Sequence, residues 1–167
     1  MSSLDERAQR IARIIAQIAK NLRLPSLVDS VSPGLTTSQM LILVLLEESD
    51  KPALSMSEIA ADLGVSLPTV TSLVDRLVGR DLVERGASER DRRLVLLRLT
   101  PYGREVIHQI LLVIGELVKH VLADVSEAEQ EQFASGTERV FELSRQVRER
   151  QKHGLAAGHE PAGGGAG

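Results

Sequence analysis

Apolar residues recur every three or four positions along most of this chain, which is the spacing of one face of an α-helix. The pattern predicts a first helix from Ser3 to Pro25, followed by a loop over residues 27–34. Thr36 and Gln39 then form a capping box at the start of a second helix, whose residues are apolar on nearly every side. We expect this second helix to be buried.

The same periodicity returns in the last third of the chain. Thr100 caps a long helix that extends to about Asp124, and Ser126 with Glu129 caps a final helix. Beyond these helices the sequence loses its period and becomes rich in glycine. A disordered tail is therefore predicted over residues 151–167.

Between these helical regions, the chain contains two short helices joined by a tight turn. Ser55 and Glu58 form a capping box at the start of the first, and Gly64 supplies the left-handed residue at which it ends. Ser66 is an N-cap for the second helix, where Pro68 is tolerated in the first turn. The apolar residues at the offsets that a helix-turn-helix core requires are Ile59, Leu63, Val65, Val70 and Leu73.

A predicted β-hairpin follows the two short helices. One strand begins at residues 82–84, a turn-rich segment covers residues 86–91, and a run of leucine and valine within residues 94–99 gives the second strand. Two short helices followed by a β-ribbon describe a winged helix. The predicted fold class is mainly α (α+β), a winged helix-turn-helix with N- and C-terminal dimerisation helices.

Polar residues cluster on the outer face of the second short helix. Hydroxyl groups bond base edges or phosphates, threonine methyls contact thymine methyls, and arginine binds guanine or phosphate, so this surface suits a major groove. For any one of these residues, the alternative is an ordinary solvated helix face. The predicted DNA-binding positions of this helix are Ser66, Pro68, Thr69, Thr71, Ser72 and Arg76.

The distribution of charge supports the same interpretation. The formal net charge of the 167 residues is −3, yet residues 76–104 hold eight arginines and four acidic residues, a local charge of +4 that leaves −7 for the remainder. An arginine-rich hairpin on an otherwise acidic chain is typical of a phosphate-binding surface. Double-stranded DNA is therefore the predicted partner.

The segments SEIAADLGVSLPTVTSLVDRLVGRDLVER and SERDRRLVLLRLTPYGREV resemble the MarR-type transcriptional regulators, and the resemblance covers roughly residues 4–150. It implies that the helix beginning near Ser66 enters the major groove. It also implies that an Asp-x-Arg element at the tip of the wing, here Asp91-Arg92-Arg93, places an arginine in the minor groove.

The resemblance gives each residue of the wing tip a role in this sequence. Asp91 is the orienting carboxylate, with Arg76 as a candidate partner, and Arg93 is the minor-groove side chain. Arg90 and Arg92 contact phosphates in the same assignment. Because the three arginines are so close in sequence, which of them enters the groove stays open.

Amphipathic helices at the two ends of the chain offer more apolar surface than one small winged helix can cover. We therefore expect a two-fold homodimer that presents two recognition helices to a pseudo-palindromic site with half-sites roughly 34 Å apart. The alternative is that the apolar stripes pack within one chain. The predicted interface residues are Leu4, Ile11, Ile15, Ile18, Val118, Leu122, Phe133 and Val140.

These elements imply a division of the chain into four parts. Residues 1–34 form an N-terminal dimerisation helix and loop, and residues 35–100 form the winged helix-turn-helix. Residues 101–150 form the C-terminal dimerisation helices, and the tail occupies residues 151–167.

Other function classes lack their sequence signatures. No glycine-rich phosphate loop, His/Cys cluster or nucleophile elbow is present, so neither enzyme activity nor a cofactor is expected. A metal site is the alternative to ordinary solvated side chains where Glu105 with His108 and Glu116 with His120 stand at i, i+3 and i, i+4 spacings. The absence of cysteine excludes disulfides and thiol-based sensing.

The sequence also bears on cellular location. No apolar stretch approaches the ~20 residues needed to span a membrane. The N-terminal residues lack the basic-then-apolar order of a signal peptide. A cytoplasmic protein without a membrane partner is therefore expected.

Together these features predict a homodimeric, sequence-specific DNA-binding transcriptional regulator. Repression is favoured over activation because occupying a promoter needs fewer additional contacts. The alternative is a winged-helix protein-interaction module without specific DNA binding, which has no reason to keep five arginines within residues 85–98. The family resemblance also implies a small-molecule effector. Because the chain has so few aromatic residues, we expect an aliphatic pocket lined by the first two helices and by the long helix that follows Thr100. Regulation without an effector stays open.

Overall fold

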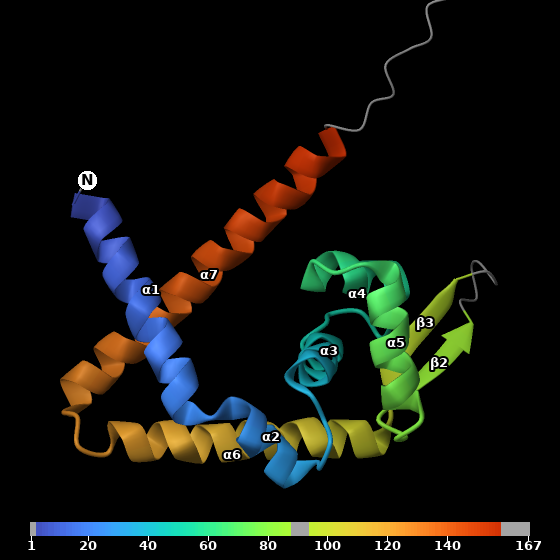
Figure 1. Ribbon diagram of the computed structural model, residues 1–167, viewed down its shortest axis with the longest axis horizontal. Helices are drawn as coiled ribbons and strands as arrows, with labels where there is room; N and C mark the ends of the chain where they lie inside the picture. Colours follow the sequence, from blue (N-terminus) through green and yellow to red (C-terminus); the bar gives the residue numbers. More distant parts are fainter. Residues whose placement is uncertain (1–2, 88–93, 158–167) are drawn as a thin grey trace, which may run out of the picture. The chain divides into compact units, whose positions relative to one another are not determined.

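The computed structural model describes residues 3–87 and 94–157, and it confirms a mainly helical winged helix-turn-helix (Figure 1). The chain divides into two units, Met1–Leu117 and Val118–Gly167. In chain order, the elements are α1 (Ser3–Leu22), α2 (Leu24–Val31), α3 (Thr37–Glu47), β1 (Leu54–Ser55), α4 (Met56–Leu63), α5 (Leu67–Val78), β2 (Val83–Ala87), β3 (Val95–Leu99), α6 (Pro101–Leu122) and α7 (Glu127–Ala157).

The core of the first unit is built from aliphatic side chains of α3, α4, α5, the sheet and the first part of α6. Fully burying one such side chain contributes about 1.5–3 kcal/mol to folding. The three aromatic side chains of the chain are all exposed instead. Core residues with no exposed surface include Ile42, Ile59, Leu77, Leu97 and Ile107.

The sheet is antiparallel and has the strand order β1-β3-β2. The two-residue strand β1 was not predicted, because it is too short to show alternation, and it pairs Leu54 with Leu97. β2 continues to Ala87, opposite Val95, so the turn predicted from residue 86 is wrong at its start. Pairing with β3 outweighs the low strand preference of glycine at that point.

The loop predicted over residues 27–34 is wrong, because most of it belongs to the helix α2. α1 ends at Leu22, and Arg23 adopts a left-handed conformation with φ of 47°. Pro25 then occupies the first turn of α2, where its missing N–H is no loss. Val28 is completely buried in the core, which stabilises this short helix. The proline expected to end the first helix therefore lies in the first turn of the next.

The start of α6 packs closely on the segment between α5 and β2. Thr100 donates its backbone N–H to the Leu82 carbonyl (3.2 Å) and its hydroxyl to the Asp81 carbonyl (2.5 Å). The same hydroxyl accepts from the Gly103 N–H (2.8 Å), which confirms the predicted cap. A Cβ atom at Gly103 would lie 1.9 Å from the Leu82 carbonyl oxygen, so only glycine fits there.

The first unit extends beyond residue 100 into α6. Val106, Ile107 and Ile110 are buried in the same core as the helix-turn-helix. The first turns of α6 therefore belong to the winged helix as much as to any dimerisation segment.

The second unit contains the end of α6 and the long helix α7. Ser126 donates its backbone N–H (3.2 Å) and its hydroxyl (2.5 Å) to the same carboxylate oxygen of Glu129, which confirms the cap expected there. α7 continues to Ala157, so the disordered tail predicted over residues 151–167 is wrong at its start. Glutamine, lysine, leucine and alanine in that stretch are strong helix formers, and their propensity extends the helix.

We expect Gly103→Ala to lower the free energy of unfolding by roughly 3 kcal/mol or more, because the added methyl meets backbone that cannot move aside. Gly115→Ala is the matched control, since Gly115 lies in the same helix with nothing within 4 Å of its would-be Cβ. That control should gain up to about 1 kcal/mol. Urea unfolding followed by circular dichroism measures both, and equal stability of the two variants would contradict the close approach.

Candidate nucleic-acid interface

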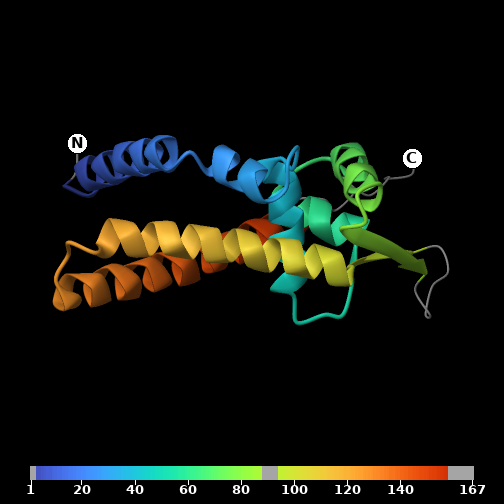
Figure 2. The same cartoon turned by 90° about the horizontal axis from the view of Figure 1, so that it is seen from below.

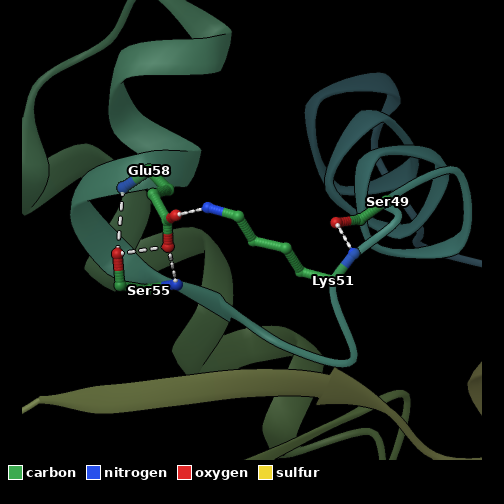
Figure 3. Close-up of polar contacts among 4 residues, drawn as sticks. All are labelled: Ser49, Lys51, Ser55 and Glu58. Atoms are coloured by element: carbon green, nitrogen blue, oxygen red, sulfur yellow. Dashed lines mark hydrogen bonds and ion pairs between the residues drawn. The ribbon is translucent and has the colours of Figure 1, made fainter.

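The first helix of the helix-turn-helix, α4, begins at the predicted capping box. The Ser55 hydroxyl accepts from the Glu58 N–H (3.2 Å), and a Glu58 carboxylate oxygen accepts from the Ser55 N–H (2.7 Å). Lys51 pairs with the other oxygen of that carboxylate (Figure 3). The hydrogen bond from Lys51, followed by those from Ser55, lowers the pKa of Glu58 from 4.5 to about 2. The carboxylate is thus ionised at neutral pH and holds the start of α4.

The turn after α4 and the core together fix the orientation of α5. Gly64 ends α4 with φ of 66°, and the Ser66 hydroxyl then accepts from the Thr69 N–H (3.4 Å), as expected of an N-cap. α4 and the hairpin strands lie beside α5 (Figure 1). The residues that anchor one face of α5 in the core, all without exposed surface, are Val70, Val74 and Leu77.

The opposite face of α5 is exposed, and it holds every recognition-helix residue predicted from the sequence. Those residues are Ser66, Pro68, Thr69, Thr71, Ser72 and Arg76. The structure adds that most of their hydroxyl groups already have partners within the helix. The Ser66 and Thr69 oxygens are 2.8 Å apart, and the Thr71 hydroxyl donates to the Leu67 carbonyl (2.9 Å). Local bonds of this kind are common for serine and threonine in helices, which is the signal that could have predicted them.

An ion pair that sequence analysis missed joins α5 to the hairpin. The Arg85 guanidinium of β2 donates to the Asp75 carboxylate of α5 at 2.5 Å. Both side chains are more than a third exposed, so the pair adds only about 0–1 kcal/mol to stability. It links β2 of the hairpin to the exposed face of α5.

The arginine-rich segment is not a uniform phosphate-binding surface. Arg80 donates to the Ser32 hydroxyl (2.7 Å) and to the Pro33 carbonyl (3.0 Å), and Arg104 pairs with a glutamate of α3. The local charge of +4 therefore overstates the cations available to DNA. Within residues 3–87 and 94–157, the arginines of this segment that have no partner among the described side chains and backbone are Arg76 and Arg98.

The tip of the hairpin, with Arg90, Asp91, Arg92 and Arg93, lies outside the described residues. Their assignment as an orienting carboxylate, a minor-groove arginine and phosphate contacts stays a prediction. The two strands that lead towards these residues project away from α3 and from the start of α6 (Figure 2).

The apolar side chains predicted for a dimer interface lie on the surface of their elements. α1 has no buried residue. The predicted interface residues that are exposed are Leu4, Ile11, Ile15 and Ile18 on α1, Val118 on α6, and Phe133 and Val140 on α7, while Leu122 on α6 is half-buried. Apolar side chains repeated along one face of a helix are typical of a surface that another chain covers.

The histidine of one candidate metal pair packs α6 against α3. His108 Nε2 lies 2.6 Å from one carboxylate oxygen of Glu47, and Arg104 Nε lies 3.6 Å from the other. Within the described part of the chain, no three side chains of the types that bind metals gather at one place. The helices described there also include none with the length and hydropathy to cross a membrane.

The fold and this surface define a winged helix-turn-helix protein. Residues 34–94 match the family model of the MarR family. The chain is 27% identical over 108 residues to the transcriptional repressor MprA of Escherichia coli (strain K12), across 65% of this chain and 61% of MprA. It is 26% identical over 145 residues to the HTH-type transcriptional repressor MdtR of Bacillus subtilis (strain 168), across 86% of this chain and 92% of MdtR.

A comparison of folds agrees with these sequence matches. The crystal structure of Streptococcus pneumoniae FabT in complex with DNA superposes with a TM-score of 0.66 at 25% identity, across 84% of this chain and 99% of that one. Over residues 34–94, this chain is similar to the winged helix-turn-helix transcriptional regulators of the MarR family. Its matched segment spans about three fifths of the length of MprA.

The capping box of α4 makes the free energy of unfolding depend on pH in the acid range. Because the pKa of Glu58 is lower in the folded chain than its ordinary 4.5, its contribution is complete above about pH 4.5 and is lost as the pH falls towards 2. Glu58→Gln should therefore be less stable than the wild type at pH 6, and the difference should shrink between pH 4.5 and 2. Urea unfolding midpoints at several pH values measure this.

Lys51→Met serves as the graded control, since it removes the largest cause of the lowered pKa and leaves the bonds from Ser55. Its stability should show an intermediate dependence on pH. A constant difference between wild type and Glu58→Gln across this pH range would contradict the role assigned to the carboxylate.

Proposed function

We propose that this protein is a homodimeric transcriptional regulator that binds a pseudo-palindromic operator in double-stranded DNA. One observation carries the proposal. α5 is anchored in the core by three completely buried residues, and its opposite face is exposed beside a hairpin that bears arginine. A helix that enters the major groove needs this arrangement, with rigid support behind it and free side chains in front. The DNA complex of the similar protein FabT supports it.

In this proposal, the exposed residues of α5 contact bases and phosphates in the major groove. Arg76, which has no partner among the described residues, binds a base or a phosphate there. At the wing tip, Arg93 enters the minor groove, Arg90 and Arg92 bind phosphates, and Asp91 orients the minor-groove arginine. The Asp75–Arg85 ion pair is consistent with this geometry because it links the hairpin to α5.

We propose repression as the mode of regulation, through occupation of a promoter. The similar proteins MprA and MdtR are both named repressors. A small-molecule effector would release the operator only by binding the DNA-free dimer more tightly than the DNA-bound one. A shallow hollow along α6 offers aliphatic side chains for such a ligand, and it is lined by His108, Leu111, Leu112, Gly115 and Glu116.

Fluorescence anisotropy of the purified protein with the DNA upstream of its own coding sequence, and with a scrambled duplex, tests specific binding. We expect at least tenfold tighter binding to the upstream DNA and a steep fall of affinity with salt, because arginine contacts release counterions from phosphates. If the operator does not lie in the upstream DNA, duplexes selected from a random-sequence library replace it in the titration. Equal affinity for selected and scrambled duplexes would contradict the proposal and favour the protein-interaction module.

Sedimentation velocity tests the homodimer. We expect a dimer at micromolar concentration, and we expect Ile15→Glu to dissociate it, since the charge would be buried in an apolar interface. Gln9→Glu is the matched control, because Gln9 lies on the opposite face of the same helix. A monomeric wild type, or dissociation by both variants alike, would rule out the proposed interface.

A further inference from the structure

We infer that the first turn of α5 reads thymine, with Leu67 packed against the C5-methyl group of a thymine in each half-site. The inference rests on the proposed function, in which α5 enters the major groove. It adds a residue outside the polar set predicted from the sequence. It also names the base-edge group that the operator must present.

Leu67 is the apolar residue of α5 that the core leaves uncovered. Leu67 is 48% exposed, whereas Val70, Val74 and Leu77 further along α5 are completely buried, and Leu73 and Val78 are half-buried. Val65, in the turn before α5, is also exposed. An isolated exposed leucine is ordinary on a protein surface. This one stands at the N-terminal end of the helix, which is the end that contacts base edges in helix-turn-helix proteins.

The hydroxyl groups beside Leu67 are engaged within the helix. The Thr71 hydroxyl donates to the Leu67 carbonyl, and the hydroxyls of Ser66 and Thr69 share a hydrogen bond. Thr71 stands four residues after Leu67 on the same face of α5, and its methyl group is the part of its side chain without a polar partner. These local bonds would have to break before the same hydroxyl protons could be donated to a base. The surface immediately around Leu67 therefore offers apolar contacts, while Ser72 and Arg76 supply polar groups further along the helix.

The remaining chemistry of the first turn of α5 favours thymine over cytosine. In the major groove, the thymine methyl is the one apolar group on a base edge, and cytosine is read through its amino donor by a carboxylate. The first turn of α5 has no acidic residue, and the nearest carboxylate on the helix, Asp75, is paired with Arg85. Leu67 and the Thr71 methyl thus match the methyl-bearing base.

Deoxyuridine provides the test, because it differs from thymidine by the methyl group alone and keeps the same base pairing. The full chain is titrated by fluorescence anisotropy against a duplex selected from a random-sequence library. The thymines of one half-site are replaced singly by deoxyuridine. At least one replacement should weaken binding by the wild type about fourfold, as expected for one methyl group removed from an apolar contact. The same replacement should change binding by Leu67→Ala less than twofold, since the partner of that methyl is already gone.

Two further variants make the result specific to this side chain. Leu67→Met keeps an apolar group of similar size and should retain most of the deoxyuridine effect. Leu41→Ala removes a similarly exposed leucine from α3 and should retain all of it. Circular dichroism establishes that each variant is folded. The deoxyuridine series on the wild type is informative even if a variant fails to fold.

The outcomes separate this inference from the proposed function. Specific binding of the selected duplex without any deoxyuridine effect would overturn the inference and leave the proposed function standing. An equal deoxyuridine effect on wild type and Leu67→Ala would also overturn it, because another residue would then read the methyl group. Absence of specific binding to any selected duplex would overturn the proposed function, and the inference with it.

Discussion

The backbone contact between Leu82 and Gly103 positions three elements at once. Leu82 lies between α5 and β2, while Gly103 lies in the first turn of α6, directly after β3. Thr100 adds hydrogen bonds to the same segment from its backbone and from its side chain. The base of the hairpin is therefore fixed to both helices by main-chain atoms, which tolerate little displacement. The ion pair further along β2 then needs only to direct the free part of the hairpin.

In the winged helix, the residues that give rigidity differ from those exposed to a ligand. Its core contains aliphatic side chains and no aromatic ones, so its shape comes from close packing of small groups. The polar residues of the exposed surface divide in the same way. Arg80, Arg85 and Glu58 hold backbone and neighbouring elements in place, and they are less available to a ligand than their charge suggests. Among the described residues, fewer charged groups are therefore free of a partner than the sequence indicates.

Most of this fold could be predicted from the sequence because its signals act over short distances. The capping boxes at Thr36 and Ser55 and the left-handed Gly64 each depend on residues within three or four positions. The exposed face of α5 follows from helical periodicity in the same way. By contrast, α2 depends on burial of Val28 in the core, which cannot be predicted from neighbouring residues. The partner of Arg80 is 48 residues away, so composition alone made that arginine a candidate phosphate contact.

Arg80 joins two parts of the chain that have different surfaces. It follows the end of α5 directly, and its guanidinium holds the segment between α2 and α3 through Ser32 and Pro33. α1, which carries the exposed apolar stripe, leads into α2. A displacement of the segment between α2 and α3 must therefore either carry the end of α5 with it or break two hydrogen bonds. A single guanidinium group thus couples any movement of the segment between α2 and α3 to the end of α5.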